Sequence, residues 1–493
     1  MREFAQRLTL LHRDTDAPLV LVTAGYFINA SDPGLAEPAA LLLANQLSIE
    51  HRFFVPSRPE PADWATLTIT QAASDHHRVA QAFKAIYEGA FVATGVSKGG
   101  MASVYFRRFF PDDVDATIAY VAPQSYGDAD PRYLDFVAKL GSEACRDALH
   151  EAQRELLLRR PAMTMYMQAE AQDGFTYEDH LGIDRALETA VLELPFTFWQ
   201  YGNASHCAEI PTVAATDQEW WDFINTFNAP AYWSDYQIEL YEPYFFQAAT
   251  QLGYPAYDET HVADLLLHPG VDVAATYVLP PKMPTLDPAV MPDIADWLAS
   301  EGQRMMFVYG QNDPYTAAAF ELGDATDSFR FTVPLGNHGA EILQLPASDR
   351  ETALAALQAW TGVKPQPLVL PHAPRLRLAP PGPPPHQGSG AAGRAAARSV
   401  PRARRGLRAS SGWDCRPRAP RPPLRQASAT HANASKEKAS PALSVSAHNR
   451  AHELSGRHSH TRPFPRARRP LVHPDAGGPG RRCDQDRTAG HRR

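Results

Sequence analysis

The segment at residues 91–110, FVATGVSKGGMASVYFRRFF, decides the fold. Its first four residues are apolar and favour a strand, and Gly95 ends that run. Residues 98–110 then follow a helical pattern that stops before Pro111. A strand that runs through Gly-x-Ser-x-Gly into a helix predicts a nucleophile elbow, a tight turn that lifts a serine above a sheet. The segment therefore predicts Ser97 as a nucleophile at the end of a parallel strand.

The same alternation of strand and helix extends along much of the chain. Apolar runs predict strands at residues 19–24, 48–55, 91–94, 116–122, 305–309 and 329–333, and helical spacing predicts helices at residues 69–87, 98–110 and 350–360. This order is typical of a mostly parallel sheet with helices on both faces. We therefore expect an α/β fold with an α/β-hydrolase core.

A long helical region interrupts this pattern. Helical spacing dominates from about residue 128, and a group of prolines between residues 280 and 288 indicates its end. We expect the first part of the core at 1–127, a large helical cap insertion at 128–296, and the second part of the core at 297–366. The Arg/Pro-rich remainder, 367–493, is expected to be a disordered tail because it has too few apolar residues to form a core.

The tail is basic, whereas the rest of the chain is acidic. Residues 371–493 contain 25 Lys/Arg and 6 Asp/Glu, which leaves 22 Lys/Arg and 49 Asp/Glu for residues 1–370. An acidic surface disfavours nucleic acid, so we expect no nucleic-acid partner for the core. The basic tail has no assigned role: it is either an RNA- or membrane-binding arm or an extension without a function.

The sequence also bears on membrane association, export and disulfide bonding. The longest apolar stretch, residues 18–28, is far shorter than the ~20 residues of a membrane-spanning helix, so no membrane partner is expected. Residues 1–14 lack the apolar region of a signal peptide. Cys145 and Cys207 can form one disulfide, but the sequence is equally compatible with two free thiols.

Two later segments supply partners for Ser97. Asp313 follows the strand at 305–309, and His338 lies in a glycine-rich loop after the strand at 329–333. The chain order Ser, Asp, His at successive strand ends is that of an α/β-hydrolase triad. We predict Ser97 as nucleophile, Asp313 as the residue that orients the histidine, and His338 as the base, with no cofactor. The alternative is a turn-forming aspartate and a solvated loop histidine.

An oxyanion hole is expected beside the serine. Its donors would be the backbone N–H of Lys98 and the loop Gly25-Tyr26 after the first strand. The Lys98 ammonium group itself is expected to make a surface or capping contact.

Several longer segments resemble one family of enzymes. They are TAGYF (23–27), QLSIEHRFF (46–54), PSRPEPADW (56–64), TGVSKGGMAS (94–103), YGQNDP (309–314) and GNHGA (336–340). Together they resemble the secreted bacterial prolyl tri- and tetrapeptidyl aminopeptidases, serine peptidases of the α/β-hydrolase type. The resemblance implies a helical cap, peptide substrates, and the same triad of Ser97, Asp313 and His338.

We therefore expect a serine exopeptidase that releases tri- or tetrapeptides from free N-termini, with proline before the scissile bond. An acidic pocket would hold the substrate ammonium group, and Glu209 and Glu242 are the candidates. The alternatives are an esterase or lipase on the same scaffold and a non-catalytic relative that acts as a binding protein. The resemblance implies secretion, whereas the missing signal peptide implies the cytoplasm if the N-terminus is genuine.

Overall fold

The structure, a computed structural model, describes residues 4–31 and 34–366. The prediction of a disordered tail at 367–493 lies outside these residues. Among the described residues, no helix combines the length and the apolar character needed to cross a bilayer.

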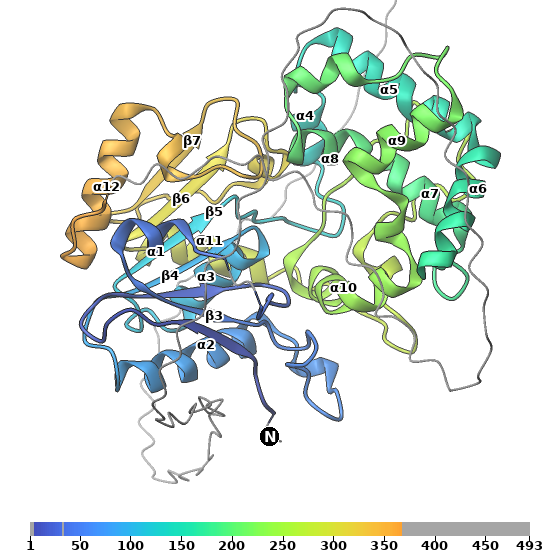
Figure 1. Cartoon of the computed structure of the whole chain (residues 1–493). Helices are drawn as coiled ribbons and strands as arrows, with labels where there is room; N and C mark the ends of the chain where they lie inside the picture. Colours follow the sequence, from blue (N-terminus) through green and yellow to red (C-terminus); the bar gives the residue numbers. More distant parts are fainter. Residues whose placement is uncertain (1–3, 32–33, 367–493) are drawn as a thin grey trace, which may run out of the picture. The chain divides into compact units, whose positions relative to one another are not determined.

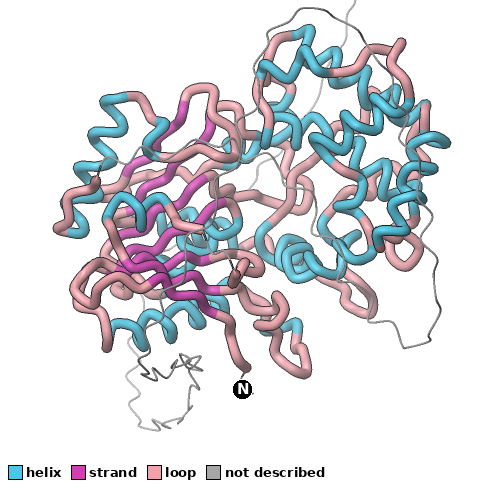
Figure 2. The backbone as a smooth tube through the Cα atoms, viewed as in Figure 1, coloured by secondary structure: helices cyan, strands magenta, loops and turns pink. Residues whose placement is uncertain are grey.

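One seven-stranded sheet forms the centre of the core (Figure 2). The strands are β1 (Leu8–Leu11), β2 (Leu19–Thr23), β3 (Asn45–Ile49), β4 (Phe91–Val96), β5 (Ala116–Tyr120), β6 (Met305–Gly310) and β7 (Phe329–Val333). Their order is β1-β3-β2-β4-β5-β6-β7, and all neighbours are parallel except β1 and β3. The expected mostly parallel sheet is confirmed. Because β2 to β7 run in one direction, the loops after these strands lie at the same edge of the sheet.

Helices cover both faces of the sheet. The helices of the core are α1 (Glu37–Leu42), α2 (Ile69–Lys84), α3 (Lys98–Phe109), α11 (Val290–Glu301) and α12 (Ala347–Thr361). Residues of α1 and α12 pack with Val20, Val92 and Val308 of the sheet. The alternate residues of the strands face the other way, and they pack with α2, α3 and α11. This alternation is what a strand buried on both faces requires.

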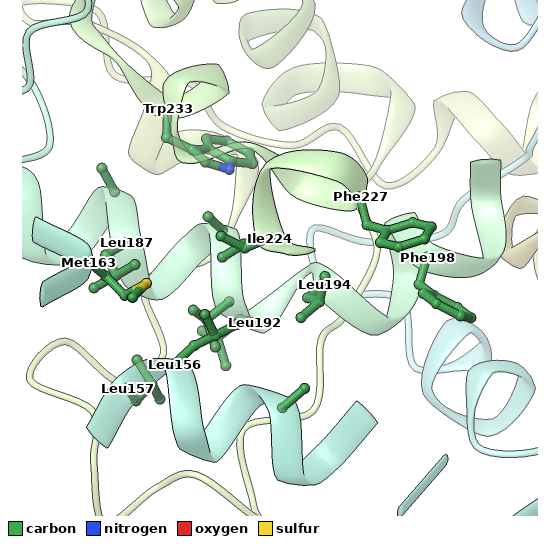
Figure 3. Packing of buried hydrophobic residues seen from close by; sticks show 14 of the residues in the cluster. Leu156, Leu157, Met163, Leu187, Leu192, Leu194, Phe198, Ile224, Phe227 and Trp233 are labelled. Carbon is green, nitrogen blue, oxygen red and sulfur yellow. The ribbon is translucent and has the colours of Figure 1, made fainter. Parts of the chain in front are cut away.

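A second set of helices lies between β5 and α11 in the chain. It comprises α4 (Arg132–Val137), α5 (Glu143–Leu158), α6 (Arg160–Glu170), α7 (Ile183–Leu192), α8 (Leu194–Tyr201), α9 (Asp217–Asn228) and α10 (Asp235–Gln247) (Figure 1). These helices have their own apolar core, in which Leu194, Phe198 and Ile224 are fully buried (Figure 3). The helical cap insertion is thus a separately packed layer of the protein.

Two local expectations differ from the structure. The strand expected at residues 48–55 is Asn45–Ile49, and the chain turns after it, with Phe53 at a φ of 72°. The apolar residues Phe53 and Phe54 are buried in this turn and so imitate a strand. The second part of the core was expected to begin at residue 297. Helix α11 begins earlier, at Val290, and its Ile294 and Leu298 already pack against the sheet. We therefore propose that the cap ends near residue 289.

Candidate active site

Ser97 occupies a strained turn between β4 and α3. Its backbone has φ 57° and ψ −127°, a region that non-glycine residues rarely adopt, and its N–H donates to the Tyr120 carbonyl at 2.8 Å. The turn is possible because its glycines allow close packing. A Cβ on Gly95 would lie 2.3 Å from the Gly99 backbone, and one on Gly25 would lie 2.5 Å from the Gly99 nitrogen. The expected elbow is therefore present, and the loop after β2 packs directly against it.

The Lys98 side chain is not at the surface, contrary to the expectation. It is 3% exposed, and its Nζ donates to the Gly25 carbonyl at 2.5 Å. The rings of Tyr26 and Phe54 lie 5.3 and 5.6 Å from the same ammonium nitrogen. Burial lowers the pKa of Lys98 well below its ordinary value. Local sequence patterns could not indicate this contact, because Lys98 and Gly25 are 73 positions apart in the chain.

This contact orients the peptide group between Gly25 and Tyr26. In a trans peptide the carbonyl and the N–H point in opposite directions. Because Lys98 holds the Gly25 carbonyl, the Tyr26 N–H faces away from the ammonium group. The first turn of α3 carries the Lys98 N–H, one of the helix N-terminal donors that are free to bind an anion. The two predicted donors, at Lys98 and Tyr26, thus belong to loops that touch each other.

Asp313 and His338 form a buried hydrogen-bonded pair. Asp313 lies just after β6 and is fully buried, and His338 follows β7 and is 8% exposed. The His338 Nδ1 and Asp313 Oδ2 atoms are 2.7 Å apart. A carboxylate at this position accepts the Nδ1 proton, which leaves Nε2 as the basic nitrogen. The other oxygen, Oδ1, accepts a hydrogen bond from the Tyr315 N–H at 3.2 Å. Both oxygens of the carboxylate are therefore hydrogen-bonded.

The loop that carries His338 is held from two sides. On the cap side, the His338 N–H donates to the Gln200 carbonyl at 3.0 Å, at the C-terminal end of α8. On the core side, Glu37 accepts from the N–H groups of Ile342 and Leu343 at 2.8 and 2.9 Å. Burial raises the pKa of Glu37 to about 7. Sequence reasoning missed both contacts, because neither Glu37 nor Gln200 belongs to a motif.

Tyrosine rings surround the histidine. The Tyr315 ring centroid lies 5.0 Å from that of His338, and the Tyr201 centroid lies 6.1 Å from it. Tyr26, beside the elbow, contacts Tyr244 of α10 with a centroid distance of 5.7 Å. All four tyrosines are half-buried. Core and cap residues together make these aromatic surroundings.

The two carboxylates predicted to bind substrate have other surroundings. Glu242 is buried in α10, where its Oε1 accepts from the Leu279 N–H and pairs with the Lys282 ammonium, each at 2.9 Å. Glu209 ends the 3₁₀ helix Ala204–Glu209 and is exposed. The role of both carboxylates in substrate binding stays a prediction.

A disulfide joins Cys145 of α5 to Cys207, with the two Cα atoms 5.4 Å apart. It links two parts of the cap, and Cys207 follows α8 by six residues. Of the two states compatible with the sequence, a disulfide or two free thiols, the structure contains the disulfide.

Comparisons with known proteins identify the family of this chain. Residues 2–375 match the family described as PS-10 peptidase S37. The chain is 43% identical over 369 residues to a prolyl tri/tetrapeptidyl aminopeptidase of Streptomyces mobaraensis, and the match covers 74% of this chain and 77% of that protein.

Among solved structures, the chain is similar to a proline iminopeptidase of Mycobacterium smegmatis, with 15% identity, coverage of 72% and 94%, and a TM-score of 0.29. It is also similar to a thermophilic esterase of Thermogutta terrifontis, with 13% identity, coverage of 72% and 91%, and a TM-score of 0.29. Scores this low carry no argument about function, and the assignment rests on the family match and the curated relative. The chain therefore belongs to the PS-10 peptidase S37 family and is a serine peptidase.

Proposed function

We propose that the protein is an exopeptidase that releases tri- or tetrapeptides from free N-termini, with proline favoured before the scissile bond. The observation that carries the proposal is the 2.7 Å contact between His338 and Asp313 at the sheet edge where Ser97 forms a strained elbow. The name of the Streptomyces relative supports the substrate class.

The proposed reaction is acyl transfer in two steps. His338 Nε2 takes the proton of the Ser97 hydroxyl as its oxygen attacks the scissile carbonyl carbon. The N–H groups of Lys98 and Tyr26 stabilise the oxyanion, and Asp313 stabilises the imidazolium. His338 then gives its proton to the leaving amine as the peptide bond breaks. In the second step a water, deprotonated by His338, attacks the acyl-enzyme and releases the peptide acid and Ser97.

Secretion is part of the proposal. Disulfides form and persist mainly in oxidising compartments outside the cytosol, so the Cys145–Cys207 bond supports export. Detection of the protein in the culture medium of its native host, and not in washed cells, is the expected result.

The test is hydrolysis of Ala-Ala-Pro-p-nitroanilide with a free and with an acetylated N-terminus. Wild-type protein should cleave the free peptide, and Ser97→Ala should lower turnover by about 10⁶-fold. Faster turnover of p-nitrophenyl esters than of either anilide would favour the esterase alternative. A folded wild-type protein that cleaves none of these substrates would be a non-catalytic relative, and the proposal would fail.

A further inference from the structure

Two buried carboxylates of the cap have no role in the reaction described above. Glu193 joins α7 to α8 and is 6% exposed, and Asp272 lies before the 3₁₀ helix Ala274–Tyr277 and is 7% exposed. The Tyr254 hydroxyl donates to Glu193 at 3.1 Å, and the Tyr277 hydroxyl donates to Asp272 at 2.7 Å. These two tyrosine rings are neighbours, with centroids 6.4 Å apart. The carboxylates therefore belong to one cluster.

One oxygen of the Asp272 carboxyl group lacks a hydrogen-bond partner among the described residues. This oxygen, Oδ2, is buried. No ion pair joins Asp272 to a lysine or arginine in the described part of the chain. Burial, and then the charge of Glu193, raise the pKa of Asp272 well above its ordinary value. A buried carboxylate oxygen without a donor is costly, and a cationic ligand would relieve that cost.

Helix α8 connects this cluster to His338. Glu193 precedes the first residue of α8, and Gln200, near its last residue, accepts the hydrogen bond from the His338 N–H. Glu193, Phe196 and Gln200 recur at intervals of three and four residues, so they share one side of the helix. The Phe196 ring lies 5.0 Å from Tyr315, and Tyr315 lies 5.0 Å from His338.

The opposite side of α8 is fixed in the cap. Leu194 and Phe198 are fully buried there, and Figure 3 shows them among the apolar residues of neighbouring helices. Tyr244 lies near both sites, since its side chain hydrogen-bonds to Tyr315 and the nearby Glu193 charge adds to burial in raising its pKa. The helix is thus a rigid spacer between the carboxylates and the histidine.

The length of this spacer matches a short peptide. From residue 193 to residue 200 a helix rises about 10 Å at 1.5 Å per residue. An extended peptide spans about 10–11 Å over three residues, from its terminal nitrogen to the carbonyl carbon of the third residue. A dipeptide would span only about 7 Å. A ligand whose cation lies at Glu193 and Asp272 would therefore place its third carbonyl near His338 and Ser97.

We propose that Glu193 and Asp272 bind the N-terminal ammonium group of the substrate, and that α8 sets a spacing of three residues between this group and the scissile bond. The inference rests on the proposed function, and it names the part of the site that recognises a free N-terminus. Glu242 is less suited because Lys282 already supplies a cation at 2.9 Å, and Glu209 because it is exposed.

The first test compares Ala-Ala-Pro-p-nitroanilide with a free and with an acetylated N-terminus, for wild type, Glu193→Gln and Asp272→Asn. Each substitution should lower the ratio of kcat/KM for the free over the blocked peptide by about 10- to 100-fold, as expected for the loss of one charged contact. Glu151→Gln is the matched control, because it removes one carboxylate from an exposed position on α5. A misfolded variant would lose activity on both peptides in proportion and would keep its ratio.

The second test varies peptide length in the wild-type protein. Free Ala-Ala-Pro-p-nitroanilide should exceed Ala-Pro-p-nitroanilide in kcat/KM by about 10-fold or more, and Asp272→Asn should reduce this advantage. If the wild type prefers free peptides while both variants keep the wild-type ratio and the wild-type kcat/KM on each peptide, the ammonium site is refuted and the proposed function stands. If the wild type cleaves blocked and free peptides equally well, the ammonium site and the exopeptidase proposal both fail, and only the serine peptidase activity stands. If the wild type cleaves no peptide, both proposals fail.

Discussion

The edge of the sheet and the helical cap place their polar residues in different ways. At the sheet edge, Ser97, Asp313 and His338 each follow a strand, so their positions depend on short segments and on strand order. In the cap, Glu193 and Asp272 come from a helix junction and a loop, and only the packing of several helices brings them together. The proposed catalytic residues are thus encoded in local segments, whereas the proposed substrate-binding residues depend on tertiary packing.

The largest expected effect concerns the sheet edge. Asp313→Asn should lower kcat by about 10⁴-fold, because an amide at this position favours the wrong tautomer of His338. Steady-state kinetics on Ala-Ala-Pro-p-nitroanilide would measure the loss, and a thermal melt would show that the variant is folded. A loss smaller than 10-fold in a folded variant would contradict the role of Asp313.

A change in the cap should act on stability more than on chemistry. The double variant Cys145→Ser, Cys207→Ser removes a crosslink between residues 62 positions apart. Its free energy of unfolding should fall by about 4 kcal/mol, the loop-closure value for a loop of this length. Urea unfolding of wild type and variant would measure the change. An unchanged midpoint would show that the crosslink contributes nothing to the cap.

A smaller effect concerns how the stability of the core depends on pH. His76 in α2 is buried against Phe106, and burial lowers its pKa from 6.5 to about 3. Because the unfolded chain takes up this proton first, stability should be lost as the pH falls from about 6.5 to about 3. In His76→Phe the slope of unfolding free energy with pH should fall by about 1.4 kcal/mol per pH unit in that window. Unfolding curves at pH 7, 6, 5 and 4 would measure it, and an unaltered slope would argue against a buried neutral His76.

The sequence predicted most of the sheet because strand and helix signals are local. The strand at 329–333 has the predicted bounds, and the strands at 19–24, 91–94 and 305–309 differ by one or two residues. The error at 48–55 arose because the apolar side chains of Phe53 and Phe54 are buried in a turn. Strand β1 (Leu8–Leu11) was not predicted, since it is short and lies at the edge of the sheet.

The candidate site could be predicted only in part. The elbow motif and the loops after β6 and β7 were enough to select Ser97, Asp313 and His338. The buried ammonium group of Lys98 depends on a carbonyl 73 residues away, and its environment cannot be seen in a local pattern. Glu193 and Asp272 are separated by 79 positions in a region of varied helical spacing, so no motif could identify them. The burial of both carboxylates and the unsatisfied Oδ2 atom of Asp272, which are properties of the folded state, identify them.

The most direct measurement is mass spectrometry of the protein after reaction with a fluorophosphonate, which modifies activated serines. The proposed mechanism predicts one modified residue, Ser97, with hydrolysis lost in proportion to labelling, and no labelling in a folded His338→Ala variant. Peptide hydrolysis that persists after full labelling of Ser97, or a label found on another serine, would contradict it.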